Sequence, residues 1–197
     1  MIAGADEAGR GPLAGPVVGA VVILPKRFRD ERIQDSKKLS AAKREYLSEY
    51  IKEVAIAYAI VAVGHTRIER INIREASRLA MGLALERVRR KVEPTLLLVD
   101  GNMELFTNLP QRAVIKGDSL HIQISAASII AKVWRDALMK KLDSKYPGYG
   151  LAGHAGYPTA AHRDFIATKG PSRIHRKTFR GVIEYLGNGI GENADAF

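Results

Sequence analysis

Four acidic residues stand at the ends of apolar segments that are expected to form strands. Asp6 and Glu7 follow MIAGA, Asp100 ends TLLLVD, and Asp118 ends AVIKGD. Functional sites collect at strand ends in α/β sheets. Carboxylates gathered at one such edge would destabilise one another unless a cation compensated them, and oxygen ligands suit Mg²⁺ or Mn²⁺. Two such ions roughly 3.5–4 Å apart can stabilise both the attacking and the leaving oxygen of a phosphodiester.

The adjacent pair Asp6–Glu7 sets a geometric condition on this site. Neighbouring residues of a regular strand point to opposite faces, so both can bind one metal only if the strand bends or ends there. Gly9 and Gly11 follow at once and permit such an ending. Each acid taken singly also has a plainer interpretation, as a turn residue or a helix cap.

The glycine-rich segment GRGPLA (9–14) matches the dinucleotide-binding pattern G-x-G-x-x-A. That motif requires a helix directly after the turn, because the helix N-terminus holds the pyrophosphate. Here Pro12 and Pro16 interrupt the turn, and the β-branched run 17–24 predicts a strand. The dinucleotide interpretation is therefore rejected. The exposed amides of the turn could still donate to phosphate or hydroxyl oxygens. The alternative is a tight connection that merely needs glycine.

Composition narrows the class of protein. The 197 residues suffice for one domain, or one domain with a small appendage. No cysteine is present, which excludes disulfide scaffolds, thiolate zinc sites and cysteine nucleophiles. A formal net charge of +10 favours a polyanionic partner such as nucleic acid, although a basic surface could also serve solubility alone.

Hydrophobic patterning gives no sign of a membrane segment or a secretory signal. The longest apolar run, 17–24, falls short of the ~18 residues needed to cross a bilayer. The N-terminus lacks the basic and then apolar layout of a signal peptide. We therefore expect a cytoplasmic protein with no membrane partner.

Strand-like and helix-like segments alternate along the chain. Ser40 and Asn72 are expected to cap helices, and Pro147-Gly148 to end one. The alternation predicts an α/β fold with a mixed sheet flanked by helices and a small C-terminal helical appendage. The expected strands are 1–5, 17–24, 56–64, 95–100 and 113–118, and the expected helices are 40–55, 71–92 and 121–146, followed by a loop at 148–159 and short helical segments near 160–168 and 178–186.

Several motifs in order resemble those of one family, type 2 ribonuclease H (ribonuclease HII). The resemblance extends from Ile2 to about Phe179. The motifs that carry it are ADEAGRGPLAGPVV, DSKKLS (35–40), INI, LVDG (98–101), KGD (116–118), SAASIIAKVWRD (125–136), YPGYG (146–150) and HAGYPTAAH (154–162).

The resemblance implies a fold, an activity and a set of metal ligands. It implies a ribonuclease H-like catalytic domain at 1–146, with the appendage at 147–197 packed on it. It implies an endonuclease that hydrolyses the RNA strand of RNA–DNA hybrids and also cuts at ribonucleotides embedded in duplex DNA. The products carry 5′-phosphate and 3′-hydroxyl ends. The acids that match the family's catalytic and metal-binding set are Asp6, Glu7, Asp100 and Asp118, with Mg²⁺ or Mn²⁺ in a two-metal mechanism.

The same resemblance implies the residues that bind substrate. Gly9, Arg10 and Gly11 match a motif that probes the ribose 2′-hydroxyl through its backbone, which is how a protein can distinguish RNA from DNA. Tyr157 matches a tyrosine that packs against the sugar after the ribonucleotide. Lys37 and Lys38 resemble residues that face phosphates, with a solvated loop as the alternative.

Other polar residues of the matching motifs have less specific interpretations. Lys132 and Arg135 are either phosphate contacts or plain surface. The five histidines form no zinc pattern, and His154, His162 and His175 are expected to contact backbone or phosphate. Two other functions stay open, a non-catalytic nucleic-acid-binding module and a related DNA nuclease or resolvase. We expect a monomer.

Overall fold

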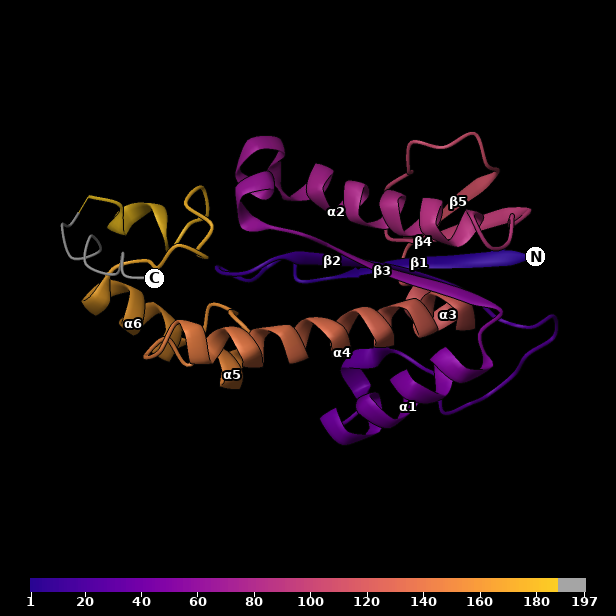
Figure 1. Ribbon diagram of the computed structural model, residues 1–197, viewed down its shortest axis with the longest axis horizontal. Coiled ribbons are helices and arrows are strands. Elements are labelled where there is room, and N and C mark those ends of the chain that lie inside the picture. Colours follow the sequence, from indigo (N-terminus) through magenta and orange to yellow (C-terminus); the bar gives the residue numbers. More distant parts are fainter. Residues whose placement is uncertain (188–197) are drawn as a thin grey trace.

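The computed structural model describes residues 1–187 and contains one five-stranded mixed sheet. The strand order is β3-β2-β1-β4-β5, so the N-terminal strand lies at the centre (Figure 1). Its neighbours differ in direction: β2 is antiparallel to β1, and β4 is parallel to it. The strands are β1 (Ile2–Ala8), β2 (Val17–Ile23), β3 (Ala57–Val63), β4 (Leu96–Asp100) and β5 (Gln111–Val114).

The parallel pairing of β1, β4 and β5 brings their carboxyl ends to one edge of the sheet. The register joins Ala5 to Val99 on the neighbouring strand, and Asp6 and Asp100 are the next residues on their strands. Strand β5 joins β4 in the same direction, and Asp100 pairs with Val114. The common direction of these three strands therefore places Asp6 and Asp100 close together at that edge of the sheet.

Helices cover both faces of the sheet, as the alternating sequence predicts. One long helix, α2, lies on one face, and α4 with α1 beside it lies on the other (Figure 1). Ser40 caps α1 by accepting a hydrogen bond from the Lys43 amide at 3.3 Å. The helices are α1 (Ala41–Val54), α2 (His65–Arg89), α3 (Gly117–Leu120), α4 (Ile122–Lys145), α5 (Leu151–His154) and α6 (Ala160–Lys169), and the 3₁₀ turns are η1 (Ser36–Lys38) and η2 (Ile183–Tyr185).

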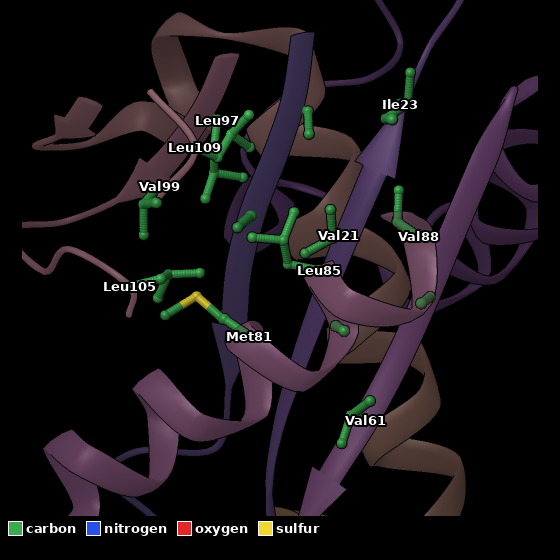
Figure 2. Close-up of a cluster of buried hydrophobic side chains, with 14 of the residues drawn as sticks. Val21, Ile23, Val61, Met81, Leu85, Val88, Leu97, Val99, Leu105 and Leu109 are labelled. Carbon is green, nitrogen blue, oxygen red and sulfur yellow. The ribbon is translucent and has the colours of Figure 1, made fainter. Parts of the chain in front are cut away.

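The core under α2 is formed by apolar side chains of the helix and of all the strands except β5. Leu85 of α2 lies beside Val21 of the sheet, and Met81 of the same helix points toward Leu105 (Figure 2). Helical spacing of the apolar side chains of α2 and strand alternation of those of the sheet produce the two matching faces. Burial of this cluster anchors the central strands, and hence the edge that carries the acids.

Several expected elements differ from the structure. The strand expected at 1–5 is Ile2–Ala8, so Asp6 and Glu7 lie inside it and both pair with β2. The loop expected at 148–159 contains α5, and the helical segment expected near 178–186 is only the 3₁₀ turn η2.

The strand expected at 113–118 is Gln111–Val114, so Asp118 does not end a strand but lies in the first turn of α3. Lys116 adopts a left-handed backbone conformation that turns the chain into this short helix. The helix expected at 71–92 begins earlier, at His65, and Asn72 lies at a kink inside it. Asn72 still caps the second segment, because its Oδ1 accepts from the Glu75 amide at 3.1 Å.

The chain after α4 packs against the end of the sheet that is remote from the N-terminus (Figure 1). Met139 of α4 shares an apolar cluster with Leu151 and Ile174, and Ala14 forms an isolated bridge with His175. The expected division into a catalytic domain at 1–146 and an appendage at 147–197 stays a prediction. The last ten residues of that appendage, 188–197, lie outside the described part of the chain. No helix within residues 1–187 is long and apolar enough to span a membrane.

Candidate active site

The acidic edge comprises Asp6, Glu7, Asp100 and Asp118. Asp6 is 5% exposed, and its Oδ1 accepts a hydrogen bond from the Glu7 amide at 2.7 Å. Asp100 Oδ1 accepts from the backbone amides of Gly117 at 2.8 Å and Asp118 at 3.4 Å. Asp118 therefore contacts Asp100 through its backbone amide, although it lies on α3 and not on a strand.

One lysine connects the acidic edge to the 3₁₀ turn η1. Lys37 Nζ lies 3.2 Å from Asp118 Oδ2, while the lysine side chain itself remains 80% exposed. The capped turn positions this lysine, because the Asp35 side chain accepts from the Lys37 amide at 2.9 Å. An exposed ammonium group thus supplies positive charge beside a buried carboxylate.

Burial and mutual repulsion raise the pKa values of Asp6, Glu7 and Asp100. Desolvation raises the pKa of Asp6 well above its ordinary value, and the charges of Glu7 and Asp100 raise it further. Desolvation also raises the pKa of Glu7, against the opposing charge of Arg10. For Asp100, burial and then the charge of Asp118 raise the pKa. The edge therefore holds negative charge that the protein itself compensates only partly.

A pocket of about 250 Å³ opens beside the acidic edge. Three of the four acids line it, and Asp118 lies next to it through its contact with Lys37. The glycine turn and Tyr157 line the same pocket, whereas Lys38 does not. The lining residues are Asp6, Glu7, Ala8, Gly9, Arg10, Gly11, Ser36, Lys37, Arg44, Asp100, Ser128, Lys132 and Tyr157.

The two glycines of the turn have different surroundings. Gly9 has φ +96°, and a Cβ on it would come within 2.1 Å of Arg135 Nε, so the fold itself requires glycine there. A Cβ on Gly11 would meet only the ring of Tyr157, at 3.9 Å, which is an ordinary contact. The packing of the described chain does not require glycine at this exposed position, which faces Tyr157 across the pocket.

Arg135 corrects one of the sequence-based interpretations, because it is neither a phosphate contact nor plain surface. Its side chain is 0% exposed and donates to the carbonyl oxygens of Ala14, Pro16 and Ala155. A second arginine, Arg176, is equally buried and was not singled out from the sequence. Nothing in a basic segment such as SRIHRK distinguishes a buried guanidinium from exposed ones.

The histidines lie behind the Tyr157 loop and contact backbone groups, as expected. His162 Nδ1 lies 2.9 Å from the carbonyl oxygen of Tyr157, and His154 Nε2 lies 2.8 Å from that of Tyr149. His162 Nε2 also lies 3.1 Å from His175 Nε2. Burial, and to a smaller extent the charge of His162, lowers the pKa of His175 to about 3.

Lys132 lines the pocket, and its ammonium group also forms an ion pair with Asp136 at 2.8 Å.

The chemistry of the acidic edge fits a hard divalent cation. Glu7 Oε2 is buried and has no hydrogen-bond partner among residues 1–187, so it presents free lone pairs. All four candidate ligands are carboxylates, which Mg²⁺ and Mn²⁺ prefer. In that same part of the chain no three acidic or histidine side chains already surround one point as metal ligands. The donor set thus fits a cation that would draw the carboxylates closer together.

Comparisons with known proteins agree on one family. The family model described as ribonuclease HII matches residues 3–182. The ribonuclease HII of Geobacter metallireducens is 51% identical over 185 residues, which cover 94% of this chain and 86% of that protein. The crystal structure of ribonuclease H2 from Pyrococcus horikoshii OT3 is 27% identical and has a TM-score of 0.79, covering 93% of this chain and 96% of that one.

A more distant structure shares the fold. The structure of Bst-RNase HIII in complex with Mn²⁺ is 17% identical and has a TM-score of 0.74. The match covers 94% of this chain and 68% of that one. The mixed sheet with helices on both faces is therefore the ribonuclease H-like architecture that the sequence predicts.

Proposed function

This chain belongs to the ribonuclease HII family, whose members are endoribonucleases, and on that premise we propose that its acidic edge is the catalytic centre. The substrates we propose are RNA–DNA hybrids and duplex DNA that contains ribonucleotides. The observation that carries the proposal is the shared pocket. Carboxylates from β1 and β4 line it together with the glycine turn and Tyr157.

Divalent cations would be held by Asp6, Glu7, Asp100 and Asp118. When bound, such ions supply positive charge beside the scissile phosphodiester and lower the pKa of water. Mg²⁺ or Mn²⁺ suits the all-oxygen donor set, and the relative Bst-RNase HIII has been crystallised in complex with Mn²⁺. The free, buried Oε2 of Glu7 supports its role as a ligand.

Other residues in and near the pocket bind and orient the substrate. The backbone of Gly9, Arg10 and Gly11 contacts the ribose 2′-hydroxyl, and the Tyr157 ring packs on the following sugar. A pocket open at Gly11 lets a sugar approach the backbone closely. Lys37 and Lys38 contact phosphates, in accord with the net charge of +10.

The hydrolysis proceeds by exchange at phosphorus. The oxygen of a water molecule forms a new bond to phosphorus, and the bond to the 3′-oxygen of the preceding nucleotide breaks. The leaving oxygen takes up a proton, so the products carry 5′-phosphate and 3′-hydroxyl ends. The position of the 2′-hydroxyl against the glycine turn selects which phosphodiester is cut.

A comparison of three substrates tests this function. An RNA–DNA hybrid, a DNA duplex with one ribonucleotide and the matched all-DNA duplex are incubated with the protein and Mg²⁺ or Mn²⁺. We expect cleavage of the first two and none of the third, with mass spectrometry identifying the ends. Cleavage of the all-DNA duplex would support a DNA nuclease or resolvase instead, and binding without any cleavage would support a non-catalytic module.

We also propose that the chain acts as a monomer in the cytoplasm. The pocket is lined by residues of a single chain, so it needs no second copy to be complete. Light scattering of the purified protein checks this, because a dimer would give twice the monomer mass of 21.6 kDa.

A further inference from the structure

The glycine turn lies against two arginines whose role the proposed activity does not explain. Arg176 and Arg135 are both 0% exposed, and neither forms an ion pair with a carboxylate within residues 1–187. Burial lowers the pKa of Arg176 to about 9, and the neighbouring charge of Arg135 adds to this effect. Two adjacent buried cations are expensive to maintain, so their hydrogen bonds identify what they stabilise.

Every nitrogen of the Arg176 guanidinium donates to a different backbone carbonyl oxygen, two of them in the glycine turn (residues 9–11) and one at Gly15. Nη2 donates to Gly9 at 2.7 Å, Nη1 to Arg10 at 2.9 Å and Nε to Gly15 at 3.0 Å. A rigid planar fork with donors in fixed directions suits this task, whereas the single ammonium group of lysine does not. Arg176 therefore fixes the orientation of two successive peptide groups, those that follow Gly9 and Arg10.

The orientation of those carbonyls determines where the amides point. In a trans peptide the C=O and the next N–H point in opposite directions, and no peptide bond in residues 1–187 is cis. With the carbonyls of Gly9 and Arg10 turned inward to Arg176, the amides of Arg10 and Gly11 point outward. Neither amide donates a hydrogen bond within the described chain, and both residues line the pocket.

Arg135 connects the Tyr157 loop, on the opposite side of the pocket, with the residues that follow the turn. Its Nη1 donates to Ala155 at 2.9 Å, and its Nη2 and Nε donate to Ala14 and Pro16 at 3.2 and 3.0 Å. The carbon atom of its guanidinium also lies 5.8 Å from the centre of the Tyr157 ring. Arg135 thus connects the loop that carries Tyr157 with residues 14–16, which follow the turn, and it packs against Gly9.

We propose that Arg176 and Arg135 are positioning residues for ribose recognition. Arg176 turns the free amides of Arg10 and Gly11 toward the 2′-hydroxyl, and Arg135 sets the spacing between that turn and Tyr157. This inference rests on the proposed function, since it assigns the two arginines to the selection of ribose over deoxyribose. Neither arginine touches the substrate itself.

The substitution Arg176→Lys tests this role, because it keeps the charge but removes the fork. Binding of a duplex with one ribonucleotide and of the matched all-DNA duplex is measured by fluorescence anisotropy in EDTA. We expect the ratio of the two affinities to fall about tenfold in Arg176→Lys, as loss of hydrogen bonds from a charged donor would produce. The matched control is Arg87→Lys, since Arg87 donates to the Ile60 carbonyl at 3.1 Å on the remote β3 strand.

The outcomes separate the inference from the function on which it rests. A wild-type protein that cleaves neither the hybrid nor the ribonucleotide duplex overturns the proposed function and the inference with it. A wild-type protein that cleaves them but binds the ribonucleotide and all-DNA duplexes equally in EDTA overturns the inference alone. A wild-type protein that prefers the ribonucleotide, with an unchanged ratio in folded Arg176→Lys, overturns the inference alone. An equal loss of affinity for both duplexes does the same, because it would show that the guanidinium fork supports nucleic-acid binding in general and not the selection of ribose.

A measurement on the unaltered protein covers the case of a variant that fails to fold. The ribonucleotide duplex should shift the ¹H–¹⁵N NMR signals of the Arg10 and Gly11 amides more than the all-DNA duplex does. Equal shifts with both duplexes would contradict the inference whether or not the lysine variants fold. Arg135→Lys provides the second variant and should lower the same affinity ratio.

Discussion

Two clusters of buried like charges flank the glycine turn, and they differ in how their polar atoms are satisfied. On one side the acidic edge holds raised-pKa carboxylates, with Glu7 Oε2 lacking any partner within residues 1–187. On the other side, each nitrogen of Arg135 and Arg176 donates to a backbone carbonyl. The cluster with free lone pairs is suited to bind a ligand, whereas the cluster whose nitrogens all donate to backbone carbonyls is suited to hold a conformation.

The largest expected effect follows from removing a ligand of the acidic edge. Asp100→Asn or Asp118→Asn should lower kcat by about a hundredfold or more, because a neutral amide cannot replace a carboxylate toward a divalent cation. Cleavage of the single-ribonucleotide duplex with Mg²⁺ measures the loss. Glu53→Gln on the exposed surface of α1 is the control and should keep full activity. Full activity in Asp100→Asn would remove that residue from the site.

Substituting the two glycines of the turn separates the requirement of the fold from that of the substrate. Gly9→Ala should lower the free energy of unfolding by about 2–4 kcal/mol, because its Cβ meets Arg135 and its φ is positive. Gly11→Ala should unfold normally yet lose its preference for the ribonucleotide duplex. Chemical denaturation and the affinity ratio measure the two effects. Equal stability of the two variants would contradict the distinction.

The acidic edge should also lower the stability of the protein without metal. A carboxyl whose folded pKa is raised adds stability below its ordinary pKa of 3.8, and that stability is lost as pH rises through the folded value. Asp6→Asn should therefore raise the free energy of unfolding at pH 7 in EDTA by about 1–3 kcal/mol, while activity is lost.

Metal addition should reverse the order of the two proteins. Mn²⁺ should raise the melting temperature of the wild type more than that of Asp6→Asn, because only a folded, intact site binds the ion. Thermal unfolding with EDTA and with Mn²⁺ provides both measurements. A lower stability of Asp6→Asn in EDTA would show that the carboxylate is already well compensated.

An effect that disappears near neutral pH concerns His175, which lies behind the Tyr157 loop. The folded pKa of His175 is about 3, below its ordinary 6.5, so its contribution is complete above pH 6.5 and is lost as pH falls toward 3. The slope should be at most about 1.4 kcal/mol per pH unit. Denaturation of wild type and His175→Gln across this range isolates the effect. Identical slopes in the two proteins would exclude His175 as the titrating group.

Local patterns in the sequence predicted most elements and the acidic set, but not every position. The apolar spacing of Leu47 and Ile51 and the cap at Ser40 gave helix α1 nearly to the residue. The expected strand at 113–118 was wrong beyond Val114, because Lys116 enters the left-handed region and starts α3. Alternation alone could not say how Asp6 and Glu7 share a site, since both lie inside β1, which pairs with β2 as far as Ala8 but with β4 only as far as Ala5.

The sequence by itself determined the types of group available: four carboxylates, a glycine turn and a basic surface, in an order that matches ribonuclease HII. Hydrophobic periodicity and the residue preferences of turns act over a few residues, so they can be recognised in the sequence. Only the tertiary structure decided that Asp6 lies next to Asp100 and that Arg135 and Arg176 are buried under the turn. Those facts depend on parallel strand pairing and on contacts up to 167 residues apart in the chain, which no local pattern records.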